Sequence, residues 1–155
     1  MLPYLIAFFI SMVPLIELRG AIIYAAAAGL PWLATYFVCF LGNIVPVPFI
    51  LLFIRRILAA MQKSRVRFFV RISRWVEEKA RKNYNKVQKY AVFGLFLFVA
   101  IPLPGTGAWT GSLIAAMLDM RMKYALPSIL LGVACAGLLM TLVAYGFIAG
   151  LDFIL

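Results

Sequence analysis

Glu17 and Arg19 are the residues of this sequence whose types and positions best suit chemistry. They are the only charged residues before Arg55, and they lie between Pro14 and Gly20 in otherwise apolar sequence. Charge inside an apolar segment is energetically costly, so such side chains usually face a partner or a water-filled cavity. One interpretation is that both side chains merely hold an irregular turn together. The other is that Arg19 binds an anionic head group, while Glu17, whose protonated form is favoured by burial, carries a coupling proton.

A second break in apolar sequence, at residues 102–109, carries no charge. Pro102, Pro104 and Gly105 fall within four positions, which excludes a regular helix there. The backbone N–H groups of such a turn, with the positive end of a helix that begins near Gly107, can hold an anion. The alternative is that these residues only build the turn.

Together the two breaks predict one substrate-binding or ion-binding site. Asn43, an amide in the following apolar segment, could contribute to this site, or could make a simple hydrogen bond between helices. The candidate site residues are Glu17, Arg19, Gly20, Asn43, Gly105, Thr106, Gly107 and Thr110. We expect each broken segment to fold as a hairpin, and the hairpin tips are marked by Pro14, Pro102 and Pro104.

Other kinds of chemistry find little support in the sequence. It contains no histidine, and Cys39 and Cys135 lie in apolar runs without metal-ligand or redox spacing. No Gly-rich phosphate loop follows a strand pattern, and no activated nucleophile is recognisable. We therefore expect no metal site and no cofactor, and we do not expect an enzyme.

The composition indicates that membrane helices position the candidate site. Of the 155 residues, 66% are hydrophobic and 13% are charged, whereas an ordinary globular chain is roughly 45–50% apolar. A soluble domain this small would lack the polar surface to cover so much apolar side chain. The sequence predicts an all-α polytopic membrane protein.

Two segments are long enough to cross a membrane. A spanning helix needs about 20 apolar residues, and residues 31–54 and 124–151 meet this requirement. Residues 1–30 and 90–119 are each too short for two spans and are broken near the middle. Irregular backbone at membrane depth survives only inside protein or beside a wet cavity. We therefore interpret both as re-entrant hairpins, with a single kinked span as the alternative for each.

Prolines and glycines mark special points in the two spans. Pro46 and Pro48 predict a kink in the first span. Gly132, Gly137 and Gly146 predict close contacts between the second span and neighbouring helices.

The order of features is similar in both halves and predicts an internal duplication. In each half, a broken segment with Pro-Leu and Gly-Ala precedes an alanine-rich stretch and then a span. The repeats are residues 1–54 and 90–152, joined by residues 55–89. Since a re-entrant hairpin leaves by the side it entered, each repeat crosses once and the second copy is inverted. Inverted repeats with broken helices are typical of secondary transporters.

The joining segment carries the whole net charge of the chain. Residues 55–89 hold twelve of the fifteen basic and two of the five acidic residues, which accounts for the net charge of +10 at pH 7. Apolar residues recur at helical spacing among the bases, which predicts an amphipathic helix lying on an anionic leaflet. Basic segments beside membrane spans normally stay cytoplasmic, so both termini are expected outside.

This basic helix predicts the partners of the protein. We expect membrane lipids with anionic head groups to bind it, and no nucleic acid. A homodimer is left open. The expected lipid-facing side chains are Arg67, Arg71, Arg74, Arg81, Lys82 and Lys86.

The segments Pro14–Ile22 (PLIELRGAI) and Pro102–Gly111 (PLPGTGAWTG) resemble the family of small multidrug export proteins over almost the whole chain. That family resembles a branch of the DedA/VTT (SNARE-associated Golgi protein) membrane superfamily. The resemblance implies a multi-pass protein of the prokaryotic cytoplasmic (inner) membrane, with two facing re-entrant hairpins in an inverted repeat. It also implies proton-linked transport or scrambling of phospholipids or polyprenyl phosphate carriers. The second break lacks the arginine of many DedA proteins. The residues that match the motifs of the two hairpins are Glu17, Arg19, Pro102, Gly105 and Gly107.

The sequence therefore predicts a membrane transporter or flippase that moves an anionic lipid or a lipid-linked phosphate, with proton coupling as a further hypothesis. Two alternatives stay open. One is a small-molecule multidrug exporter in which Glu17 binds the substrate. The other is a membrane scaffold that transports nothing and binds anionic lipid through its basic helix.

Overall fold

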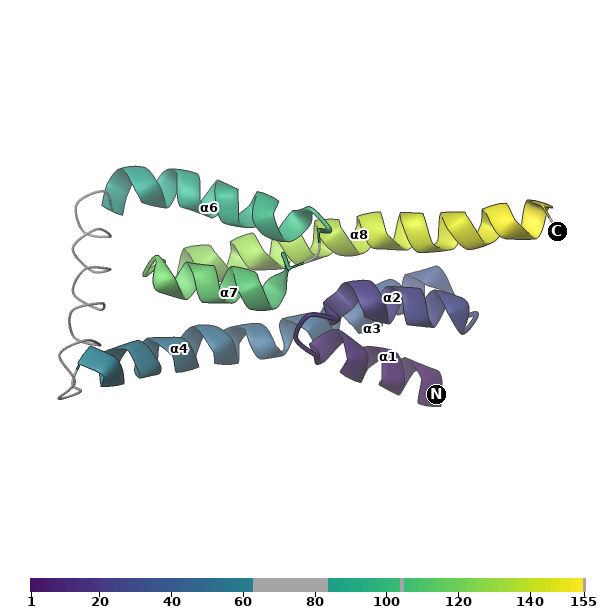
Figure 1. The fold of residues 1–155 in the computed structure, drawn as a ribbon, viewed down its shortest axis with the longest axis horizontal. Coiled ribbons are helices and arrows are strands. Elements are labelled where there is room, and N and C mark those ends of the chain that lie inside the picture. The colour runs from purple at the N-terminus through teal and green to yellow at the C-terminus, as the bar shows by residue number, and fades with distance from the viewer. Residues whose placement is uncertain (63–83, 104, 155) are drawn as a thin grey trace.

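A computed structural model describes residues 1–62, 84–103 and 105–154 of the protein (Figure 1). These residues form α-helices joined by short turns, and no strand occurs among them. The prediction of an all-α protein is confirmed for this part of the chain. The helices are α1 (Leu2–Met12), α2 (Glu17–Ala27), α3 (Trp32–Ile44), α4 (Pro46–Gln62), α6 (Tyr84–Ala100), α7 (Ala108–Met117) and α8 (Met122–Ile154).

Two long helical elements run the length of the molecule. The first consists of α3 and α4, separated only by Val45, which keeps helical angles of φ −49° and ψ −47°. The division falls directly before Pro46, which has no backbone N–H, and so lies where the prolines predict a kink. The second is α8. Within the described residues, Trp32–Phe53 and Met122–Ile148 are long and apolar enough to cross a membrane.

Two pairs of short helices complete the fold. In the first pair, α1 and α2 are joined by residues 13–16, the first turn. In the second pair, α6 and α7 are joined by residues 101–107, the second turn. Both turns lie near the middle of the long axis, and the two pairs extend from there toward opposite ends of the molecule (Figure 1).

Each short pair packs on the other half of the chain as well as on its own. α1 and α2 contact α3, and α6 and α7 contact α8. In addition, α2 packs against α8, and α7 packs against α4. The second short helix of each half therefore packs against a long helix of the other half, and this packing brings the two turns together.

Small residues allow this close packing. Ala21 and Ala25 of α2, and Ala108 and Ala115 of α7, are fully buried. A Cβ atom added to Gly132 would lie 2.7 Å from the Val99 side chain of α6.

The glycine predictions for α8 hold at two of three positions. Gly132 meets α6, and a Cβ atom on Gly137 would lie 3.0 Å from the Tyr36 ring of α3. The prediction for Gly146 is wrong, because a Cβ atom there would meet nothing within 4 Å. The end of α8 extends past its neighbours (Figure 1), so this glycine faces open space.

Helix extends into the predicted linker from both sides. α4 continues to Gln62 and α6 begins at Tyr84, so the helices do not end at the predicted boundaries of 54 and 90. No glycine or proline occurs between Pro48 and Gly94 to end a helix. Lys86 lies within α6. The other predicted lipid-facing residues lie outside the described part of the chain: Arg67, Arg71, Arg74, Arg81 and Lys82.

Large apolar side chains face outward from the helices. Phe49 of α4 and Phe147 of α8 are 69% and 70% exposed, and many similar side chains accompany them. So much exposed apolar surface is unusual in a soluble monomer and suits contact with lipid. With the two long apolar helices, it supports the assignment of the chain as a membrane protein.

Candidate functional site

The first turn aims a carboxylate into the protein. Leu15 has φ +73° and Glu17 has φ +50°, left-handed values that are unfavourable for residues with a Cβ atom. The unusual backbone at Glu17 starts α2 with its side chain turned inward, and Glu17 is only 5% exposed. Such strain persists only where the surrounding structure holds it, and it is concentrated at functional sites.

The second turn is made of residues that leave room for this carboxylate. Gly105 has φ +81° and Gly107 has φ +154°, which favours glycine at both positions. A Cβ atom on Gly107 would overlap the carboxylate of Glu17. The Thr106 hydroxyl lies 2.8 Å from the Ile101 carbonyl oxygen and 2.9 Å from that of Leu103, either of which can accept its proton.

Glu17 caps a helix of the other half. Gly107 is the N-cap residue of α7 and has no side chain to accept a hydrogen bond from the first N–H groups of the helix. The backbone N–H of Trp109 donates to Glu17 Oε1 at 3.1 Å. The carboxylate thus supplies the missing cap and lies at the positive end of the α7 dipole.

Arg19 binds the second turn just after the end of the preceding helix. α6 ends at Ala100, and the guanidinium of Arg19 donates to the carbonyl oxygens of Leu103 and Ile101, the latter at 3.4 Å. It also donates to Thr106 Oγ1 at 2.8 Å. A cation at the C-terminal end of a helix satisfies free carbonyl groups and the negative end of the dipole.

A third side chain, from the second half, donates to the first half. The indole Nε1–H of Trp109 donates to the carbonyl oxygen of Met12, the last residue of α1, at 3.1 Å. We call the bonds of Glu17, Arg19 and Trp109 across the two turns the turn contact. Trp109 is not among the site residues predicted from the sequence, although a tryptophan in apolar sequence signals a need for an acceptor, because its N–H is usually bonded when buried.

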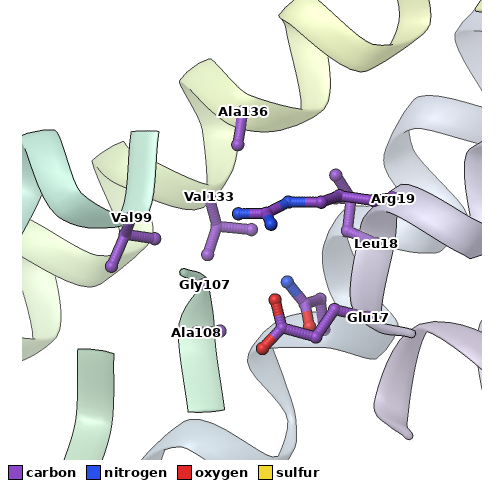
Figure 2. Close-up of a pocket in the computed structure, with 9 residues that line it drawn as sticks. Glu17, Leu18, Arg19, Val99, Gly107, Ala108, Val133 and Ala136 are labelled. Carbon is purple, nitrogen blue, oxygen red and sulfur yellow. The ribbon is translucent and has the colours of Figure 1, made fainter. Parts of the chain in front are cut away.

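A small hollow, with room for roughly one water molecule, lies beside the turn contact (Figure 2). Glu17 and Arg19 project into it from the start of α2, and the Glu17 carboxylate lies next to Gly107 and Ala108 (Figure 2). Asn43 of α3 also lines it, is 2% exposed, and has no hydrogen-bond partner for Oδ1 among the described residues. The full lining is Glu17, Leu18, Arg19, Asn43, Val99, Gly107, Ala108, Val133 and Ala136.

The structure brings together some of the predicted site residues and separates others. Gly105, Thr106 and Thr110 lie outside the lining of the hollow, although Thr106 binds Arg19. Gly20 approaches the Ile16 side chain instead. Pro14 is exposed, Pro102 is half-buried, and residue 104 is not among those described. The residues that meet at the hollow are Glu17, Arg19, Asn43 and Gly107.

The environment of Glu17 shifts its proton affinity. Glu17 lies outside the two candidate membrane-spanning helices. Burial raises the pKa of its carboxyl above the ordinary value of 4.5, while the Trp109 N–H, the charge of Arg19 and the Ala108 N–H act to lower it. Burial is the largest of these influences, so the protonated form is favoured more than in water.

The comparisons with known proteins concern one family. The model of the family described as "Putative small multi-drug export protein" matches residues 17–139. The chain belongs to this family. The match begins at Glu17 and includes every residue that lines the hollow and all residues of the turn contact except Met12. No curated protein and no solved structure matches the chain.

Membership of the small multi-drug export family confirms part of the sequence-based resemblance. The matched segment contains both predicted motifs from Glu17 onward and both candidate membrane-spanning helices as far as residue 139. Among the described residues, no group of three His, Cys, Asp or Glu side chains could hold a metal ion.

Proposed function

We propose that the protein exports small molecules across a membrane, and that a proton on Glu17 drives its transport cycle. The observation that carries this proposal is the buried Glu17 carboxylate, which is bound at the N-terminus of α7 and borders a hollow. A carboxylate shared between the two halves of the chain can couple its own protonation to their relative position. The family description supplies the class of function.

In the proposed membrane arrangement, α3–α4 and α8 cross the bilayer. The pairs α1–α2 and α6–α7 enter as re-entrant hairpins from opposite faces, which makes the two halves inverted repeats. The basic segment lies on the cytoplasmic side and both termini lie outside. Support comes from the position of the two turns near the middle of the long axis (Figure 1), and from the packing of α2 on α8 and of α7 on α4. Broken helices that meet near the midplane are the usual sites of secondary transporters.

The turn contact supplies a two-position element for this mechanism. The ionised carboxylate of Glu17 binds the N–H groups of α7 strongly, because the bond is charge-assisted and the helix dipole adds to it. A neutral carboxyl binds them less strongly, so protonation loosens the contact. The hollow has room for roughly one water molecule, far less than the roughly 300–1,000 Å³ of pockets that hold drug-sized ligands. Loosening the contact would enlarge it.

The geometry favours a small-molecule substrate over an anionic lipid. The groups expected to bind a phosphate are already bonded within the protein. Arg19 donates to Leu103, Ile101 and Thr106, and the N-terminus of α7 receives Glu17. The interior acceptors that remain, Asn43 Oδ1 among them, would not attract an anion.

The decisive experiment measures flux in vesicles that contain the purified protein. Glu17→Gln and Arg19→Ala should abolish transport of a fluorescent cationic dye driven by a pH gradient, while the folded protein elutes normally in size-exclusion chromatography. Asp119→Asn makes the same change of carboxyl to amide at an exposed turn residue that does not line the hollow and should leave flux unchanged. Normal dye flux in Glu17→Gln would contradict the proposal.

Two other outcomes would favour the alternatives from the sequence. Movement of a labelled anionic lipid without dye flux would support the flippase. Loss of function only on neutralising bases of residues 63–83 would support the scaffold. An inner-membrane location, anionic-lipid binding, homodimerisation, DedA/VTT membership and the lack of enzymatic activity stay predictions.

A further inference from the structure

Asn43 presents a buried acceptor that nothing in the described structure satisfies. It lies on α3, two residues before the break at Val45, and it is 2% exposed. Its Oδ1 has no hydrogen-bond partner among the described residues. Buried polar atoms are nearly always paired, so an unpaired one requires an explanation.

The lining of the hollow contains no side chain that serves as the missing donor. Leu18, Val99, Val133 and Ala136 are apolar. The guanidinium of Arg19 is directed to acceptors of the second turn. An ionised carboxylate such as Glu17 is an acceptor only.

Protonation of Glu17 supplies a donor, because a protonated carboxyl gains one O–H group. We propose that Asn43 Oδ1 is the acceptor for the coupling proton, so that Glu17 donates its O–H to Asn43 when protonated and accepts from Trp109 N–H when ionised. This inference rests on the proposed function and deepens it by naming a second residue of the proton site. The proton comes from water, and no covalent bond between heavy atoms changes.

The charges near this site are few. Arg19, on the same helix as Glu17, is the group whose charge acts on Glu17 among the described residues. The lining residues from α3, α6, α7 and α8 are Asn43, Val99, Ala108, Val133 and Ala136, and none is ionisable. A pH-dependent change in the turn contact would therefore report Glu17 itself.

The proposal predicts the direction in which the pKa of Glu17 changes when Asn43 is replaced. A hydrogen bond to the neutral form of an acid favours that form and raises its pKa. Removing the acceptor should therefore lower the pH at which Glu17 titrates. A net hydrogen bond of ordinary strength corresponds to a shift of about one pH unit.

The experiment follows the carboxylic C=O band of Glu17 by infrared spectroscopy during a pH titration of the full chain in liposomes, without substrate. The band is identified by its loss in Glu17→Gln. Asn43→Leu keeps the side-chain size and should lower the midpoint by about one unit. Thr35→Val is the matched control, because Thr35 is a buried polar residue on α3 that bonds Tyr145 and does not line the hollow. Its midpoint should stay unchanged.

A second variant keeps the inference testable if Asn43→Leu does not fold. Asn43→Asp is isosteric and places a second carboxyl in the lining of the same hollow as Glu17, so the two should share one proton and the midpoint of the Glu17 band should rise. An unchanged or raised midpoint in Asn43→Leu, or no rise in Asn43→Asp, would overturn the inference. A titrating Glu17 band that ignores both substitutions would leave the proposed function intact. Absence of a protonated Glu17 at every pH would refute the proton role in both.

Discussion

The first and second turns meet at one place but contribute opposite kinds of groups. The first turn is followed by two charged side chains, Glu17 and Arg19, and it reaches left-handed backbone angles without glycine. The second turn offers backbone N–H and carbonyl groups and the Thr106 hydroxyl, and its left-handed positions are glycines. Each turn therefore completes the other: Glu17 meets the free N-terminus of α7, and Arg19 meets the acceptors of the second turn. Neither half of the chain contains a finished site.

The largest loss of stability and transport is expected when the close approach of the two turns is disturbed at Gly107. Gly105 and Gly107 both have positive φ, so alanine costs about 1–3 kcal/mol of strain at either position. Only at Gly107 would the added Cβ atom also overlap the Glu17 carboxylate, whereas at Gly105 nothing lies within 4 Å. Gly107→Ala should therefore lower the thermal unfolding temperature in detergent far more than Gly105→Ala, and should abolish transport.

Equal unfolding temperatures for the two variants would indicate that backbone strain alone matters. The close approach of the two turns would then play no part in stability. Transport by a folded Gly107→Ala protein would show that transport does not depend on the turn contact.

The sequence was informative about the first turn and much less so about the second. Charge in apolar sequence identified Glu17 and Arg19, and prolines and glycines located both breaks, because these signals are carried by single residues. The two apolar spans followed from length and hydrophobicity alone.

The partners of the charged residues could not be predicted. Arg19 binds carbonyl oxygens of residues 82 and 84 positions away, and every residue has a carbonyl group, so no residue type marks the acceptor. The hypothesis of anion binding between Arg19 and the second turn failed to anticipate that Glu17 itself would occupy the N-terminus of α7. Gly146 was misassigned because composition does not reveal which part of α8 extends past its neighbours.

A smaller effect should distinguish the charge of Arg19 from its shape. The guanidinium reaches three acceptors of the second turn at once, whereas a lysine ammonium is a single point of charge and cannot span them. Arg19→Lys should cost about 1–2 kcal/mol of unfolding free energy, a value reduced because the side chain is half-buried. Thermal unfolding at matched pH measures it. Native stability in Arg19→Lys would show that positive charge suffices and that the forked geometry of the second turn is unimportant.

The smallest expected effect lies where the second turn supports the first. Trp109→Phe removes the Nε1–H bond to Met12 but keeps the backbone N–H that binds Glu17. Loss of one neutral hydrogen bond should cost about 1 kcal/mol, and transport should continue because the carboxylate keeps its cap. Trp32→Phe is the control, since Trp32 of α3 is 54% exposed, and it should leave both unfolding temperature and flux nearly unchanged. If Trp109→Phe instead stops transport in a folded protein, the indole takes part in the cycle, and the division between a charged first turn and a second turn that only binds those charges is too simple.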